Sequence, residues 1–114
     1  MGALSIGSVV LIAFPFSDLS ASKLRPALVL AAAGKDDWIC LQITSKAYAD
    51  TGPIELTDAD FVEGSLRRAS YLRPAKLFTA HASLFQRIVG RINSNKLEQT
   101  RKAVIEIIRS GSAA

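Results

Sequence analysis

Residues 9–30 read VVLIAFPFSDLSASKLRPALVL, and this stretch decides the fold class. Residues 9–16 form a nearly continuous apolar run rich in β-branched and aromatic side chains, which predicts a strand buried on both faces. Residues 17–24 are mostly small and polar and predict a loop. Residues 26–32 predict a second strand, because proline is tolerated at the first position of a strand. The stretch therefore predicts two neighbouring strands of a β-rich protein.

The following residues continue this pattern of short strands. Residues 38–44 (WICLQIT) alternate, which predicts a third strand with Ile39, Leu41 and Ile43 facing the core and the other side chains on the opposite face. Residues 57–65 form an acidic segment that is long enough for one helical turn. Further strands are predicted at residues 53–56, 68–78 and 85–92.

The last part of the chain changes to a helical period. Asn93 or Ser94 can cap the start of a helix that is expected to run to about Arg109. The residues expected on its apolar stripe are Leu97, Val104, Ile107 and Ile108. Many short strands followed by one helix predict a mainly β (α+β) fold, in which a helix packs on a small antiparallel barrel.

Length and composition indicate one globular domain. The 114 residues suit a single domain over residues 1–114, with residues 110–114 as a loose tail. Cys40 is the only cysteine, so no internal disulfide can form and a reducing compartment is expected. The N-terminal apolar stretch lacks a preceding basic segment, and no apolar run approaches the roughly 20 residues of a membrane span. We therefore predict a cytoplasmic protein with no membrane partner.

Charge is distributed unevenly along the chain. The net charge is +4, and residues 64–97 contain no Asp or Glu, whereas residues 50–63 carry five acids and no base. If the basic residues share a face, they create a positive field that suits an anionic partner such as nucleic acid. The alternative is that these bases are scattered over a solvated surface.

Arg25 stands directly before the proline that opens the second predicted strand. A residue that precedes proline is restricted to extended geometry, so Arg25 is expected at the mouth of a strand beside a small polar loop. A guanidinium in such a place has five donors and a permanent charge, which suit bidentate binding of a phosphate. The alternative is a surface arginine that ends a loop.

Polar residues follow the third predicted strand and interrupt the fifth. Thr44 ends the third strand on the face opposite to Ile43, where its hydroxyl could hydrogen-bond a phosphate oxygen, and Ser45 and Lys46 follow at once. The alternative is a strand that ends in polar residues. Arg73 and Lys76 lie in the otherwise apolar segment 68–78 and could also contact an anion, although a lysine in a strand is often an edge residue that prevents aggregation.

His81 is the only histidine, and histidine is the usual acid–base residue near neutral pH. The alternative is a polar loop residue. One histidine and one cysteine cannot form a metal site of the usual kinds, and no glycine-rich phosphate loop is present. We therefore expect no metal and no cofactor.

The segments GSVVLIAFPFSDLSASKLRPALVL, LQITSK, SYLRPAKLF and RIVGRI, followed by a final helix, resemble in this order the MazF/PemK family of toxin endoribonucleases. The likeness spans residues 7–109 and is nearest to the PemK-like branch of these type II toxin–antitoxin systems. It implies a CcdB/MazF-like, SH3-like barrel and a homodimer that binds single-stranded RNA along the dimer groove. It also implies metal-independent cleavage by attack of the 2′-OH to give a 2′,3′-cyclic phosphate, and neutralisation by a small acidic antitoxin.

The resemblance also implies roles for individual residues. The arginine before the strand-opening proline of the family matches Arg25, and its threonine after the central strand matches Thr44, so these two are the expected catalytic residues. The residues expected to bind RNA or phosphate are Ser45, Lys76, Arg73, Lys23 and Gln42. His81 and Asp18 are the candidate bases. The sequence departs from the family where Arg73 and Pro74 replace an acidic-amide pair, where Lys76 replaces an arginine, and at Ser8, where aspartate is common.

Two other functions are compatible with the same sequence. One is a small β-barrel that binds nucleic acid without cutting it. The other is a toxin of the same fold that acts on a protein target such as gyrase. The match at Arg25 and Thr44 favours the nuclease, because a poison of a protein target needs no phosphate chemistry.

Overall fold

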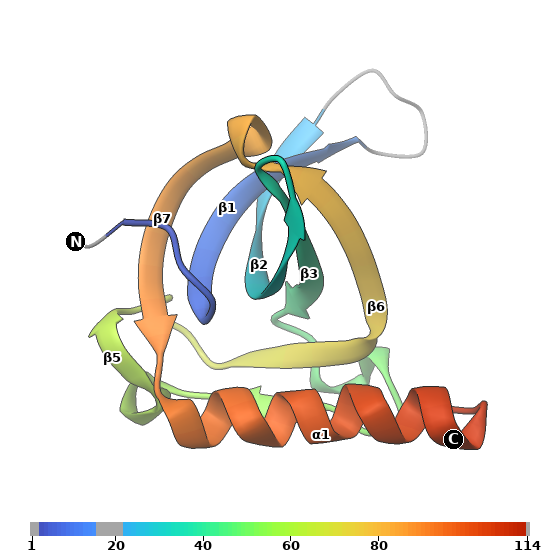
Figure 1. The fold of residues 1–114 in the computed structure, drawn as a ribbon. Coiled ribbons are helices and arrows are strands. Elements are labelled where there is room, and N and C mark those ends of the chain that lie inside the picture. Colours follow the sequence, from blue (N-terminus) through green and yellow to red (C-terminus); the bar gives the residue numbers. More distant parts are fainter. Residues whose placement is uncertain (1–2, 16–21, 114) are drawn as a thin grey trace.

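The computed structural model describes residues 3–15 and 22–113 (Figure 1). Within this part of the chain, seven strands form one antiparallel sheet in the order β4-β6-β3-β2-β1-β7-β5, which curls into a half-barrel above a C-terminal helix (Figure 1). The strands are β1 (Ser8–Pro15), β2 (Ser22–Gly34), β3 (Asp37–Thr44), β4 (Ile54–Leu56), β5 (Phe61–Gly64), β6 (Ser70–His81) and β7 (Phe85–Ile92). The helices are η1 (Ala47–Ala49), η2 (Asp58–Asp60), η3 (Ala82–Leu84) and α1 (Ser94–Ser110). The predicted mainly β fold with one terminal helix is confirmed.

A large bulge bends β6 in its middle. Leu41 of β3 pairs with Leu77, but Ile43, two residues further on, pairs with Leu72, so residues 73–76 stand outside the ladder. Pro74 fits there, because a proline has no N–H to give to a ladder and is tolerated at bulges. The bend carries the first half of β6 underneath the sheet, next to α1 (Figure 1). There it also pairs with β4.

The central strands are buried on both faces. Val9 and Leu28 face one another in the main cluster, which packs against α1, whereas the next residues, Val10 and Ala27, belong to a second cluster on the other face. This confirms the expected two-sided burial of the first strand. Cys40 is fully buried in the second cluster, so the face of β3 that was expected to point away from the core is a second core. The curl of the sheet covers this face with aromatic side chains from the ends of β3, β6 and β7.

Residues 22–24 were predicted as part of a loop, but they already belong to β2, where they pair with β1. Two further details of the predicted elements also differ from the structure. Ile39 is only half-buried and belongs to neither cluster, because the register shifts between β2 and β3 at this level. Residues 57–65 do contain one helical turn, η2, but they also form the edge strand β5, which pairs with β7. Gly64 ends β5 with φ +68°, and a Cβ there would lie 2.0 Å from the carbonyl oxygen of Val89. This close approach requires glycine.

The helix begins and ends as its sequence predicts. The side chain of Asn93 accepts a hydrogen bond from the backbone N–H of Lys96 (2.8 Å), and Gly111 closes the C-terminus in the left-handed conformation. Ile108, however, is 69% exposed, so its predicted place on the packed stripe is wrong. The last turns of α1 meet the loop around Gly52 through Ile107 instead. Among the described residues, no helix has the length and apolar character that a membrane span requires.

Candidate active site

A cleft of about 550 Å³ lies at one end of the sheet, where β3 ends and β6 begins. It exists because β2 is paired on one side only in this region. Residues 22–26 pair with β1, but pairing with β3 starts at Ala27. Pro26 has no N–H that could extend the second ladder. The edge of β2 is therefore open toward the end of β3, and side chains of both strands line the opening.

Arg25 lies on this half-paired part of β2. It pairs with Ile12 of β1, so it stands inside the strand and not at its mouth as the sequence predicted. If the register of Ala27 with Gln42 continues for two residues, Arg25 stands opposite Thr44. Its side chain is exposed and lines the cleft. The ladder to β1 holds the backbone, and a guanidinium that lines such a cleft is suited to bidentate binding of a phosphate.

Thr44 is the last residue of β3 and lines the same cleft. Its Oγ1 accepts a hydrogen bond from the backbone N–H of Lys46 (3.2 Å), a local turn that fixes the direction of the side chain. Because the oxygen is the acceptor in this bond, its own proton can be donated to a ligand oxygen. Ser45 is exposed beside it and adds a second hydroxyl to the cleft.

Arg73 enters the cleft from the bulge of β6 and is held by a carboxylate. Its Nε donates to Oδ2 of Asp50 (2.7 Å) and its Nη2 to Oδ1 (3.1 Å), a bidentate pair in which both side chains are about four-fifths buried, with exposures of 20% and 19%. The hydrogen bonds from Arg73, and the charges of Arg73 and Lys76, hold the pKa of Asp50 below its usual range. A fixed guanidinium with remaining N–H donors thus forms one wall.

Two of the residues predicted to bind RNA do not lie in this cleft. Gln42 is half-buried in the middle of β3, opposite Ala27. Lys76, at the other end of the bulge, lines a separate pocket with Tyr48 and Ile107. Arg73 and Lys76, at the two ends of the same bulge, therefore line different openings. The sequence of β6 did not predict this difference.

His81 is remote from the cleft. It pairs with Asp37 at the start of β3, whereas Thr44 pairs with Tyr71 at its end, which separates them by about 23 Å along the strand. Its Nδ1 accepts a hydrogen bond from the backbone N–H of Ser83 (3.1 Å) and caps η3. The structure thus places His81 at the end of β6, where its side chain caps η3. Asp18, the other candidate base, lies outside the described residues.

Comparison with known protein families identifies the family of the chain. Residues 5–108 match the model of the PemK-like, MazF-like toxin of type II toxin–antitoxin systems. The chain belongs to this toxin family. No curated protein sequence matches it.

Solved structures share the toxin fold at low sequence identity. The MazE–MazF structure from Deinococcus radiodurans (Form III) has a TM-score of 0.74 at 15% identity, over 93% of this chain and 96% of that chain. An endoribonuclease from a mycobacterial species has a TM-score of 0.69 at 13% identity, over 96% and 94% of the two chains. A mycobacterial endoribonuclease in complex with its cognate antitoxin has a TM-score of 0.65 at 12% identity, over 93% and 96%.

Two polar residues of this PemK-like chain were not expected in the cleft. They are Arg68 and Ser70, whereas Lys46, which also lines it, directly follows the Thr44 and Ser45 pair that the sequence singled out. Arg68 is exposed in the loop between β5 and β6. The sequence did contain a signal for it, because it lies in the acid-free stretch 64–97. Ser70 is buried and its Oγ donates to the carbonyl of Arg68 (3.3 Å), which ties this loop to β6.

Two further residues of this toxin fold are structural. Ser8, at the position where aspartate is common in the family, is buried and its Oγ accepts a hydrogen bond from the backbone N–H of Ser5 (3.0 Å). Burial raises the pKa of the Cys40 thiol to about 11, which makes it a poor nucleophile. Among the described residues, no group of three or more His, Cys, Asp or Glu side chains could hold a metal ion.

Proposed function

We propose that the chain is an endoribonuclease toxin that cleaves single-stranded RNA without a metal ion. The observation that carries this proposal is the shared cleft, in which Arg25 and Thr44 come together from two different strands. The described residues that line it include five cationic side chains and no carboxylate, which suits a polyanion. The proposal is further supported by the mycobacterial endoribonucleases with the same fold.

The proposed reaction uses a nucleophile that RNA itself supplies, the 2′-OH. A bond forms between the 2′ oxygen and phosphorus while the bond from phosphorus to the 5′ oxygen breaks. The 2′ proton passes to a base, and the departing 5′ oxygen takes up a proton. The products are a 2′,3′-cyclic phosphate and a 5′-OH. The scheme needs no metal, because the nucleophile is already held next to the phosphorus.

In this scheme the cleft residues stabilise charge on the phosphoryl group. Arg25 binds the phosphate and compensates the additional negative charge of the transition state. Thr44 donates its hydroxyl proton to a phosphoryl oxygen, and preorganised donors of this kind are each worth about 10²–10³ in rate. Lys23, Ser45 and Arg73 hold the neighbouring backbone of the RNA.

We also propose that an acidic antitoxin segment binds over the same cleft and that the toxin is a homodimer. The excess of cations in the cleft is complementary to an acidic peptide as well as to RNA. Two structures of the same fold, from Deinococcus radiodurans and from a mycobacterial species, are complexes with MazE or with a cognate antitoxin. An acidic antitoxin peptide is expected to compete with RNA for the purified toxin, and light scattering is expected to give the mass of two chains.

The decisive experiment is analysis of the ends of cleaved RNA. Purified protein is incubated with a labelled single-stranded oligoribonucleotide, with and without chelator, and with a matched oligonucleotide that carries a 2′-deoxy sugar at the cleavage site. We expect cyclic-phosphate and 5′-OH ends in both of the first two reactions, and no cleavage in the third. A 5′-phosphate end or loss of activity in chelator contradicts the scheme. Binding without fragments indicates a non-catalytic module, and growth arrest with intact RNA indicates a protein target.

A further inference from the structure

A second basic opening lies next to the cleft, on the other side of Leu66. It has a volume of about 680 Å³ and lies between β1, β7 and the loop that follows β5. Its charged side chains are Arg67 and Arg87, and its apolar wall includes Leu11 and Ile88. Leu66 lines both openings, so they are neighbours separated by one side chain.

The strand register sets how far apart the two openings are. Pro26 of the cleft pairs with Leu11, and Leu11 pairs with Arg87, so the three residues lie in one row across β2, β1 and β7. Directly paired residues of antiparallel strands point to the same face. Because neighbouring strands are about 4.8 Å apart, Arg87 stands about 10 Å from Pro26 along the sheet. Arg25, the neighbour of Pro26, pairs with Ile12 of the second cluster and lies on the other face of the sheet, so the two openings are connected through Leu66, which lines both.

The loop between β5 and β6 presents its two arginines to the two openings. Arg68 lines the cleft, and Arg67 lines the second opening. Arg67 has φ +60°, a left-handed conformation that is unfavourable for a long side chain, and its N–H donates to Oγ of Ser65 (2.8 Å). Backbone strain of this kind is concentrated at ligand sites. Neither Arg67 nor Arg87 makes a side-chain ion pair with any described residue.

We propose that the opening between Arg67 and Arg87 is a subsite for a nucleotide that flanks the scissile phosphate. This inference rests on the proposed RNA substrate. The two guanidinium groups bind the phosphate, and the planar base packs on the apolar wall or on a guanidinium plane. The RNA then crosses Leu66 between the two openings. An acidic peptide is less well matched, because its carboxylates gain nothing from a wall formed by Leu11 and Ile88.

The test measures binding separately from cleavage. The probe is a labelled 2′-O-methyl oligoribonucleotide, which cannot be cut by the proposed reaction, and anisotropy is recorded over a series of salt concentrations. Because each phosphate contact on a single strand contributes about 0.7 to the salt slope, R67Q/R87Q is expected to flatten the slope by about 1.4. Affinity at low salt is expected to fall by about tenfold or more.

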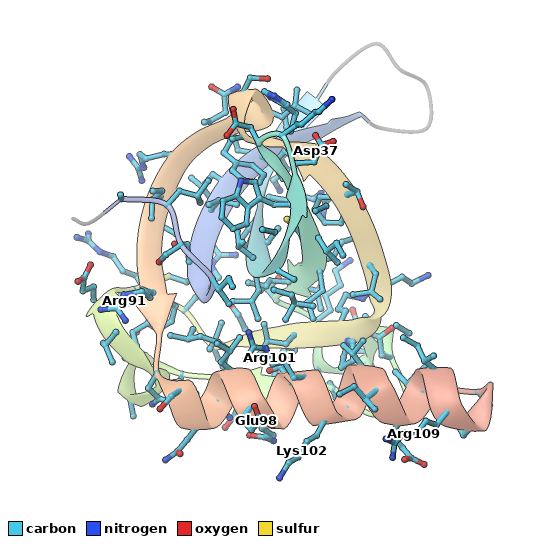
Figure 2. All side chains as sticks on the ribbon, in the orientation of Figure 1. Asp37, Arg91, Glu98, Arg101, Lys102 and Arg109 are labelled. Carbon is cyan, nitrogen blue, oxygen red and sulfur yellow. The ribbon has the colours of Figure 1, made fainter. Side chains whose placement is uncertain are left out.

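The matched control removes the same charge from a different surface. Lys102 and Arg109 are exposed on the side of α1 that points away from the sheet (Figure 2), and K102Q/R109Q is expected to keep the wild-type slope. Equal effects of the two double variants mean that only net charge matters, and they overturn the subsite. Loss of acidic-peptide binding with an unchanged RNA slope overturns it in favour of a protein partner.

Two further measurements separate this inference from its assumptions. Arg67→Gly relieves the left-handed backbone strain, so the unfolding midpoint of this variant is expected to be at least that of the wild type. Its affinity for RNA is expected to fall, and an unchanged affinity contradicts a role of Arg67 in binding.

In cleavage assays R67Q/R87Q is expected to raise KM for a long RNA but not for a dinucleotide, which has a single phosphate. Wild-type protein that binds the probe with the expected dependence on Arg67 and Arg87 but cuts no RNA refutes the proposed cleavage and leaves an RNA-binding site at this opening, whereas wild-type protein that binds no probe refutes both proposals.

Discussion

The two ends of β3 differ in how completely the sheet is paired. At the start of the strand, Asp37 pairs with both Gly34 and His81, and the N–H of Ala82 donates to the carbonyl of Asp36 (2.8 Å). That end is closed by two ladders and lies on the side of the sheet away from α1 (Figure 2). At the other end, β2 has lost its pairing with β3, and β6 bulges out of its ladder with β3 between Leu41 and Ile43 before it pairs again with Ile43 and Thr44.

This difference explains where a polar residue can act. Both ends carry polar and charged side chains. At the closed end, however, the Nδ1 of His81 is already hydrogen-bonded to Ser83, two residues away. At the open end, Arg25, Thr44 and Arg73 come from three strands and surround one space. A site that assembles groups from several strands needs a place where the ladders stop, because complete pairing leaves no room between the backbones.

The largest effect is expected at the open end for Arg25→Ala. Loss of the guanidinium removes the main stabilisation of the phosphoryl charge, so kcat is expected to fall by about 10²–10³. The side chain is exposed, and the unfolding midpoint is expected to stay within about 2 °C. Rates on a defined oligoribonucleotide and thermal unfolding measure the two quantities. A variant that fails to fold shows that Arg25 is a structural residue.

The next largest effect is expected for Thr44→Val, which keeps the shape and removes the hydroxyl. We expect a fall of about 10² in kcat with little change in KM, because the lost hydrogen bond acts on the transition state. Thr44→Ser is the matched control and is expected to retain most of the activity. Equal losses in both variants argue against the hydroxyl as the acting group.

Asp50→Asn is expected to act mainly on stability and on the position of Arg73. Because the folded pKa of Asp50 is lowered, its ion pair stabilises the fold above the usual aspartate pKa, and this contribution disappears as the pH falls through the lowered value. We expect a loss of about 1 kcal/mol at neutral pH and convergence of the two proteins in acid. Urea unfolding at several pH values measures this difference. A constant difference at all pH values contradicts the ion pair as its cause.

The smallest effect is expected at the closed end, for His81→Ala. Since His81 stands about 23 Å from Thr44 along β3, the rate of cleavage and its pH profile are expected to be unchanged. Asp18→Asn, at the other residue proposed as a base from the sequence, is the informative partner of this experiment. A changed pH profile in His81→Ala would show that the closed end of β3 also contributes to cleavage.

The strands, the terminal helix and the family could be predicted because their signals are local. Alternation, an apolar run, a capping asparagine and the arginine before Pro26 are all properties of neighbouring residues. The edge strand β5 could not be predicted in the same way. It is stabilised by pairing with β7 and by the close approach of Gly64 to Val89, both of which involve residues far away in the sequence.

The sequence by itself determined that one apolar strand begins directly after Arg25 and another ends at Thr44, and the family resemblance of these segments made the two residues the pair to examine. Only the tertiary structure decided which other cations join them. Arg73 and Lys76 are three residues apart, yet the bulge of β6 directs one into the cleft and the other toward α1. Arg68 also lines the cleft, although it was not expected there. The physical reason is that register shifts and bulges are set by the packing of distant strands, and they decide which side chains become neighbours.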